Sequence, residues 1–265
     1  MQKYRICGIQ FESGQDKEKN LEKTFLYFEE AVKQKPDFVI LPEMFEIAAK
    51  PDKVSHYTHP IPSDFTDTLS VLAKDSSVNL IGGSFFEQEG EYIYNTCLVF
   101  DRKGEIAGKY RKMHLFDAFG WGESTVFSRG EETLLLELDG LRFAVAICYD
   151  VRFPEIFRHY AVRGAKVVFL PACFLQPNHD QWQLSTCSRA LENTIFVATS
   201  NQTGSDFVGR SMVANPWGVK VCGMGIEEGY YTCDIDLSVI DQTRGKLPLI
   251  DGRRFDVILR DGDGG

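Results

Sequence analysis

The chain has 265 residues, of which 43% are hydrophobic and 25% charged, a balance typical of a globular protein. Its formal net charge is −9, so we do not expect the basic surface that sequence-independent nucleic-acid binding requires. No apolar run reaches the roughly 18 residues of a membrane-spanning helix, so we expect no contact with a membrane.

The cysteines and the N-terminal segment indicate a cytoplasmic protein. The seven cysteines are odd in number and do not have the spacing of a disulfide framework. Residues 1–12 lack the long apolar core and the small-residue cleavage site of a signal peptide. We therefore expect reduced thiols. Apart from Cys148, which is considered below, each cysteine is expected to be a small buried hydrophobic residue.

The first part of the chain alternates strands and helices. Apolar residues between 21 and 32 recur at helical spacing, whereas the continuous apolar run FVILP is typical of a buried strand. The expected elements, in order, are a strand over 4–11, the helix with the apolar residues 21–32, a strand over 38–42, a helix over about 64–74, a strand over 79–87 and a β-hairpin over 92–110.

The second part continues the alternation. Pro154 is a favoured residue in the first turn of a helix, and Gly164 is a favoured residue just after its end. The strands on either side of this helix make 142–172 a predicted βαβ unit. The remaining expected elements are a helix over 179–192, a strand over 194–200, a hairpin turned at 215–218, a strand over 230–236 and a helix that opens at Asp236.

This order of elements predicts an α/β fold in one domain. Strand–helix alternation with added hairpins is typical of helices packed outside sheets. No linker, low-complexity tract or internal repeat divides the sequence, so we expect a single domain over 1–258 and a flexible C-terminal tail over 259–265. In such folds ligands bind beyond the carboxyl ends of strands. Glu43 and Cys148 both directly follow predicted strands.

Cys148 is the candidate nucleophile. It lies between the end of an apolar strand and the helix that starts at Pro154. Near the positive end of a helix dipole, the pKa of a thiol is lowered and the thiolate is favoured. An isolated cysteine is more often a buried hydrophobic residue, but the position of Cys148 favours a reactive thiol.

A nucleophilic thiol needs a base and a group that stabilises developing negative charge. Among the five histidines only His114, in YRKMHLFD, is a serious candidate for the base. Glu43, which follows a buried strand, is the alternative, with Lys112 as a candidate for holding the charge. A lone L-P-E is a weak signal, and a lone lysine is usually solvated. Two hypotheses therefore remain: a thiol hydrolase that uses His114 as the base, and one that uses Glu43.

Together, three stretches resemble the nitrilase, or carbon–nitrogen hydrolase, superfamily. LPEMF at Glu43, KYRKMHLF at Lys112 and ICYDVRFPE at Cys148 match its Glu–Lys–Cys triad in the same order. The resemblance runs from the first strand to about residue 258. Within the superfamily, HLFD, the ES of WGEST, CYDVRFPE and RALEN are most similar to the ω-amidases and the deaminated-glutathione amidases. The resemblance implies a four-layer α-β-β-α sandwich that forms a homodimer or a higher homo-oligomer.

The resemblance also implies roles for individual residues. Glu43 would be the general base, and Cys148 the nucleophile that forms a thioester. Lys112 and the backbone N–H of Tyr149 would stabilise the oxyanion. Glu123 matches a second family glutamate, which helps to position the substrate or the base. No metal or cofactor is required.

Substrate recognition is the least determined part of the hypothesis. Arg152, four residues after the nucleophile, is the candidate clamp for a substrate carboxylate, because a guanidinium grips a carboxylate with two hydrogen bonds. A salt bridge from Arg152 to Asp150 or Glu155 is the alternative. Phe116 and Phe174 are either pocket walls or core residues.

The expected reaction is the hydrolysis of a small carboxylate-bearing amide, such as a 2-oxo-dicarboxylate monoamide, to an acid and ammonia. Two loops, AFGWG and CFLQPNHDQW, depart from the patterns of ω-amidases, and both are expected to line the substrate pocket. A deaminated-glutathione amidase or another amide or carbamoyl hydrolase of the superfamily is the alternative. A catalytically silent binding protein would lack a triad member, and all three are present.

Overall fold

The structure of the chain is a computed structural model that describes residues 2–256. The tail expected at 259–265 and the end of the domain expected at 258 lie outside these residues. In the part of the chain that is described, no helix has both the length and the apolar character that crossing a membrane would require.

The strands form two sheets. The first sheet contains β1 (Lys3–Gln10), β2 (Phe38–Ile40), β3 (Asn79–Ile81), β4 (Phe85–Glu89), β5 (Tyr92–Phe100), β6 (Ile106–Arg111) and β13 (Gly229–Asp236). The second contains β7 (Leu134–Leu138), β8 (Leu141–Val145), β9 (Val167–Ala172), β10 (Phe196–Asn201), β11 (Met212–Ala214) and β12 (Lys220–Gly223). The strand order is β13-β1-β2-β3-β5-β4 in the first sheet, where β6 also pairs with β5, and β12-β11-β10-β9-β8-β7 in the second.

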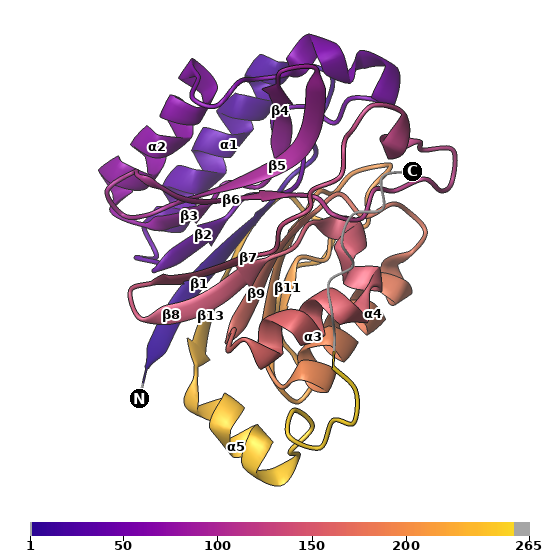
Figure 1. Cartoon of the computed structure of the whole chain (residues 1–265). Coiled ribbons are helices and arrows are strands. Elements are labelled where there is room, and N and C mark those ends of the chain that lie inside the picture. Colours follow the sequence, from indigo (N-terminus) through magenta and orange to yellow (C-terminus); the bar gives the residue numbers. More distant parts are fainter. Residues whose placement is uncertain (1, 257–265) are drawn as a thin grey trace.

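The helices cover the outer faces of the two sheets, as Figure 1 shows. They are α1 (Lys17–Val32), α2 (Asp64–Ser76), α3 (Pro154–Val162) and α4 (His179–Asn193), whereas α5 (Ser238–Lys246) lies beyond the end of β13. The pair α1 and α2 packs on the first sheet, and α3 and α4 pack on the second. The four layers are those of the expected α-β-β-α sandwich, so the predicted fold class is confirmed.

Strand β2 illustrates how the sequence produces these layers. Successive side chains of a strand point to opposite faces, so a strand that is covered on both faces is apolar throughout. Phe38 and Ile40 belong to the core between the two sheets, where the ring of Phe38 lies 5.3 Å from that of Phe169. Val39 points the other way, into the core beneath α1 and α2. Both faces of β2 are therefore covered by apolar side chains, which explains the continuous apolar run FVILP.

One strand prediction was wrong, and one hairpin was missed. The segment 79–87 forms two strands, because Gly83 has a φ of +58° and turns the chain so closely past Pro42 that a Cβ would lie 2.2 Å from the Pro42 oxygen. The hairpin of β7 and β8 was missed, although its turn, Asp139-Gly140, has the residues that a two-residue hairpin turn with positive φ prefers.

The parallel pairing of β8 and β9 confirms the predicted βαβ unit. The strand before Cys148 ends at Val145, however, and Cys148 begins a separate short 3-10 helix, Cys148–Arg152, before α3. Strands β2, β8 and β9 thus end at Ile40, Val145 and Ala172, and the segments that follow them carry the side chains of the candidate site.

Candidate active site

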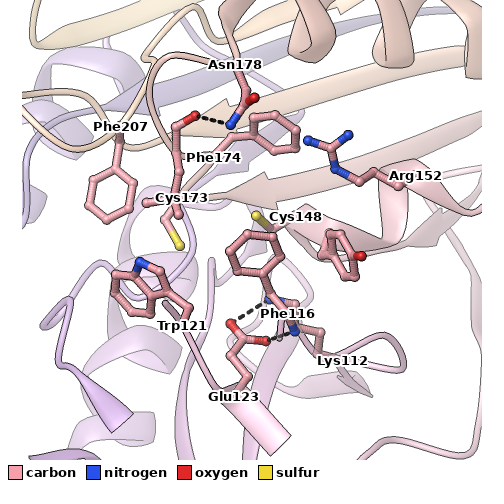
Figure 2. A pocket seen from close by; sticks show the side chains of 12 residues that line it. Lys112, Phe116, Trp121, Glu123, Cys148, Arg152, Cys173, Phe174, Asn178 and Phe207 are labelled. Atoms are coloured by element: carbon pink, nitrogen blue, oxygen red, sulfur yellow. Dashed lines mark hydrogen bonds and ion pairs between the residues drawn. The ribbon is translucent and has the colours of Figure 1, made fainter. Parts of the chain in front are cut away.

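A pocket that opens to solvent, with about 410 Å³ of empty space including its open mouth, lies beyond these strand ends. Seven of its lining residues were expected at the site from the sequence: Lys112, Phe116, Glu123, Cys148, Tyr149, Arg152 and Phe174. Five were not: Trp121, Cys173, Leu175, Asn178 and Phe207. Figure 2 shows their side chains converging on the pocket. Glu43, the eighth expected residue, lies buried behind the wall, in contact with Lys112 and Cys173.

Lys112 is held between two carboxylates. Its Nζ donates to Oε1 of Glu43 and to Oε1 of Glu123, each at 2.9 Å, and all three side chains are almost completely buried. Burial by itself lowers the pKa of Lys112, but the charges of Glu123 and Glu43 outweigh it and raise this pKa well above its usual value. The lysine is therefore a fixed, buried cation.

The two glutamates differ in electrostatic environment. Burial by itself would raise the pKa of both carboxyls. For Glu43, the charge of Lys112 and hydrogen bonds from Cys173 and Lys112 overcome burial and lower the pKa. For Glu123, burial and the charge of Glu43 prevail over Lys112 and raise the pKa. Glu43 is thus the carboxylate that stays ionised most readily, next to both thiols.

Backbone contacts fix the positions of Lys112 and Glu123. Lys112 directly follows β6, and its N–H donates to the oxygen of Asn95 at 2.9 Å. Oε2 of Glu123 accepts the N–H of Phe116 at 2.8 Å. The Nδ2 of Asn95 also donates to Oε1 of Glu43 at 2.8 Å. These bonds hold the ammonium of Lys112 and its two carboxylate partners in position at the pocket.

Cys173 is a member of the site that the sequence analysis missed. It directly follows β9, and both its N–H, at 2.8 Å, and its Sγ, at 2.9 Å, donate to Oε2 of Glu43. The expectation that Cys173 is an ordinary buried cysteine was wrong. Its place just beyond the carboxyl end of a predicted strand, which it shares with Glu43 and Cys148, is the signal that could have revealed it.

Cys148 is only 7% exposed and has a φ of +45°, a conformation that non-glycine residues rarely adopt. Its Sγ, the Sγ of Cys173 and a carboxylate oxygen of Glu43 all lie within 4.8 Å of one another. The expected lowering of its pKa is not found: burial, and then the charge of Glu43, raise the pKa of the thiol, although Cys173 and Lys112 counteract them. The 3-10 helix that follows spans only five residues, so its dipole is small.

His114 has another partner. Its Nδ1 lies 2.6 Å from Oδ1 of Asp150, and its ring stacks on Phe153 with centroids 3.7 Å apart. Asp150 also accepts a hydrogen bond from the hydroxyl of Tyr110 at 2.7 Å. Among the described residues no hydrogen bond joins His114 to Cys148. The histidine holds the segment after β6 against the Cys148 turn, which disfavours the Cys–His alternative.

Arg152 is directed into the pocket and forms no ion pair within the described part of the chain (Figure 2). Its Nη1 donates to Oε1 of Gln181 at 2.9 Å, and its guanidinium carbon lies 4.9 Å from the ring centroid of Phe174. The alternative of a salt bridge to Asp150 or Glu155 was therefore wrong.

Aromatic side chains form much of the wall. Phe116 packs edge-to-face on Tyr149, with ring centroids 5.0 Å apart. Phe174 lines the pocket and also packs on Trp182 at 5.0 Å, so it is both a wall and a core residue. Trp121 was not named individually, although the loop AFGWG that carries it was expected to line the pocket.

The other wall residues that were not named individually also come from loops. Leu175 and Asn178 lie in the segment CFLQPNHDQW, and Phe207 lies in the loop before β11. Two of the segments that depart from the ω-amidase pattern therefore shape the pocket. That departure is the signal in the sequence that points to them.

Comparison with known proteins agrees with this geometry. The family model described as "Carbon-nitrogen hydrolase" matches residues 5–245. The chain is 34% identical to "Omega-amidase NIT2" of Homo sapiens and 32% identical to that of Danio rerio, with 97% of this chain and of each relative covered.

Solved structures are similar over most of the chain. Saccharomyces cerevisiae Nit3, a member of branch 10 of the nitrilase superfamily, superposes with a TM-score of 0.88 at 32% identity, covering 96% of this chain and 97% of that one. A mutant of the amidase from Nesterenkonia sp. AN1, in complex with butyramide, gives a TM-score of 0.79 at 26% identity over 92% and 95% of the two chains. This chain therefore belongs to the carbon–nitrogen hydrolase family and is a hydrolase of amide carbon–nitrogen bonds.

Proposed function

We propose that this protein is an ω-amidase-like enzyme that hydrolyses a small amide bearing a carboxylate at its far end, releasing ammonia and an acid. One observation carries the proposal. In one pocket, a buried lysine held between Glu43 and Glu123 lies beside the candidate nucleophile Cys148, and the pocket also holds Arg152, a cation with no carboxylate partner among the described residues. The resemblance to the ω-amidases supports the same reaction class.

In the first step Glu43 takes the thiol proton of Cys148 as the sulfur attacks the amide carbon. Sγ of Cys148 lies within 4.8 Å of a carboxylate oxygen of Glu43, and this proximity supports the transfer. Since the pKa of Cys148 is raised and that of Glu43 lowered, the thiolate is not the resting form. Proton transfer then accompanies the attack, as in general base catalysis.

The negative charge that develops on the amide oxygen needs fixed donors. Lys112 remains protonated because two carboxylates raise its pKa, and its hydrogen bonds keep it in place. The N–H of Tyr149 lies in the first turn of the 3-10 helix, where N–H groups have no partner within the helix. Pre-positioned donors of this kind stabilise the tetrahedral intermediate without reorganisation.

The intermediate collapses when the carbon–nitrogen bond breaks. Glu43 returns its proton to the nitrogen, ammonia leaves, and the acyl group remains on the sulfur of Cys148 as a thioester. Glu43 then accepts a proton from water as the water attacks the thioester. The carbon–sulfur bond breaks, the thiol regains a proton, and the acid is released.

Arg152 is the proposed partner of the substrate carboxylate. Its guanidinium has unused donors that face the pocket, and the ring of Phe174 and the amide of Gln181 hold it there. An arginine can bind a carboxylate through two hydrogen bonds. An uncharged amide would leave this cation without an anion, so it is expected to be a poor substrate.

A panel of amides tests the function. Ammonia release is measured for short ω-monoamides of dicarboxylates, for their 2-oxo derivatives, for a longer peptide-like amide of the deaminated-glutathione type and for uncharged amides of matched length. We expect a carboxylated amide to have the highest kcat/KM. Equal or faster turnover of the uncharged amides would contradict the proposal.

We also propose that the chain acts as a single domain and as a homodimer that forms through the outer helices of the second sheet. Large apolar side chains are exposed there, among them Leu184 and Leu191 on α4 and Val219 in the hairpin that follows β11. The hairpin lies against α4, since a Cβ on Gly218 would be 2.9 Å from that of Leu191. Sedimentation equilibrium tests this, and a monomer at micromolar concentration would contradict it.

A cytoplasmic location is the third part of the proposal. All seven cysteines are free in the described structure, and the two at the candidate site need to be reduced for the proposed chemistry. Fractionation of the producing cells, with the protein followed by immunoblot, tests this; recovery in a secreted or oxidising compartment would contradict it.

A further inference from the structure

Two thiols and a carboxylate meet at the bottom of the pocket, and the proposed hydrolysis uses only one of the thiols. Cys148 and Cys173 come from turns that follow different strands, β8 and β9. Their Sγ atoms and a carboxylate oxygen of Glu43 lie within 4.8 Å of one another, and Sγ of Cys173 is 2.9 Å from Oε2 of Glu43. Both cysteines also line the open pocket, so the cluster can be reached from solvent.

We propose that Glu43, Cys148 and Cys173 form a binding site for a thiophilic divalent cation such as Zn²⁺ or Cd²⁺, and that its occupation blocks the nucleophile. Zinc is bound by cysteine sulfur at about 2.3 Å and by carboxylate oxygen at about 2.0–2.2 Å. In the tetrahedral geometry that zinc prefers, two such ligands are therefore about 3.6–3.8 Å apart. The observed cluster is within a small side-chain adjustment of this separation, and the pocket side leaves room for a water as the fourth ligand.

The exchange of protons for metal conserves the charge of the cluster. With both thiols protonated, Lys112, Glu43 and Glu123 carry a formal charge of +1, −1 and −1. Binding breaks two S–H bonds, forms two metal–sulfur bonds and releases two protons to solvent, with no oxidation or reduction. The dication compensates the two thiolates, so the cluster keeps its net charge and the protein buries no additional unbalanced charge.

Lys112 does not block the site, because it occupies the other oxygen of the carboxylate. The ammonium contacts Oε1 of Glu43, whereas Cys173 contacts Oε2. A cation that replaces the S–H proton of Cys173 can bind Oε2 and leave the Lys112–Glu43 pair intact. The N–H of Cys173 also donates to Oε2, at 2.8 Å, and keeps this oxygen turned toward the sulfur.

A second pair of cysteines supplies an internal comparison. Cys222 on β12 and Cys233 on β13 are neighbours, since Cys233 lowers the pKa of the Cys222 thiol and Cys222 raises that of Cys233. They belong to no group of three or more histidine, cysteine, aspartate or glutamate ligands in the described part of the chain. This pair offers two sulfurs without a carboxylate, so replacing both with serine removes the competing thiols and leaves the proposed site intact.

The direct test titrates the reduced, metal-free protein with Cd²⁺ alone. The ultraviolet charge-transfer absorption of cadmium thiolates reports how many sulfurs bind. In the background Cys222→Ser with Cys233→Ser, we expect one tight equivalent bound through two thiolates. Cys173→Ser should lose about half of this absorption and weaken binding by more than about tenfold, since changes that only reorient a ligand cost about 10–100-fold. Cys187→Ser, a half-buried thiol elsewhere, is the control and should bind like its parent.

The proposal is overturned if Cys173→Ser binds Cd²⁺ with the affinity and absorption of its parent, or if the parent binds through fewer than two thiolates. A second measurement needs no variant. In the wild-type chain, Zn²⁺ should protect Cys148 from alkylation by iodoacetamide, as read by peptide mass spectrometry, and a chelator should abolish the protection. Unchanged alkylation at saturating Zn²⁺ would refute the site. Neither readout requires turnover, so failure here is distinguishable from failure of the proposed amidase function.

Discussion

The ammonium of Lys112 lies 2.9 Å from Oε1 of Glu43, with both side chains almost inaccessible to solvent. These residues are 69 positions apart in the chain, and the pair closes only when β2 and β6 take their places in one sheet. A buried ion pair of this kind does not by itself indicate high stability, but removing one partner typically costs about 3–5 kcal/mol. Experiments on this pair therefore have to separate loss of catalysis from loss of fold.

Cys148→Ala should reduce ammonia release to background while leaving the melting temperature close to that of the wild type, because the change removes one sulfur from the pocket wall. Cys187→Ala, on the outer helix α4, is the matched control and should retain full activity. Ammonia release is measured with the best amide of the panel, and unfolding is followed by circular dichroism. Retained turnover in Cys148→Ala would rule out the thioester mechanism.

Glu43→Gln should also abolish turnover, because an amide cannot accept the thiol proton. His114→Asn should keep a measurable part of the activity, since the histidine contacts Asp150 and Phe153 and not the thiol. The comparison is made by kcat, with thermal unfolding as the control for folding. An active Glu43→Gln together with an inactive, folded His114→Asn would instead support a Cys–His hydrolase.

Lys112→Gln should lower kcat by about 10²–10³-fold, the usual effect of removing one oxyanion donor, with a much smaller change in KM. The reason is that the ammonium is proposed to contact charge that exists only in the transition state. Lys103→Gln, at an exposed position, is the control. A near-normal kcat with a raised KM would make Lys112 a ground-state binding residue.

Arg152→Met should lower kcat/KM for the carboxylated amide by tenfold or more, because hydrogen bonds with a charged group contribute about 1.5–3 kcal/mol. The uncharged analogue should lose much less, since it makes no ion pair with the guanidinium. The ratio of the two kcat/KM values is the measurement. An equal loss for both substrates would mean that Arg152 only supports the pocket wall through Phe174 and Gln181.

Glu87→Gln should weaken the acid sensitivity of the fold. Glu87 is buried on β4 and accepts hydrogen bonds from Arg111, at 2.6 and 2.8 Å, and from Lys109, at 2.8 Å. Burial raises the pKa of its carboxyl, but Arg111 and Lys109 outweigh burial and hold this pKa below the usual value of 4.5.

A carboxyl whose pKa is lowered by folding stabilises the folded state above its unfolded pKa, and this contribution is lost as the pH falls through the folded pKa. The variant should therefore be less stable near neutral pH, by about 1–3 kcal/mol, and lose less on acidification. Urea unfolding at neutral pH and well below 4.5 measures both. Equal acid sensitivity of the two proteins would contradict this assignment.

The order of elements in the sequence predicted the α/β class, and the resemblance to the nitrilase superfamily implied the four layers and the central side chains of the site. Apolar runs such as FVILP are long enough to indicate strands buried on both faces. Pro154 and Gly164 marked the start and the end of α3. Glu43, Lys112, Cys148 and Glu123 could be named because their neighbours form motifs within a few residues. All of these signals are local in the chain.

The interactions among these residues depend on packing that brings distant parts of the chain together. The contact of Cys173 with Glu43 joins positions 130 apart, and no local pattern encodes it. No local pattern encodes the pKa of Cys148 either. The sequence predicted that a helix start lowers this pKa, whereas burial raises it. Desolvation and charge–charge distance are properties of the packed structure. For this reason the sequence indicated the chemistry of the site, whereas the fold determined its protonation, its second thiol and the free guanidinium of Arg152 in the described pocket.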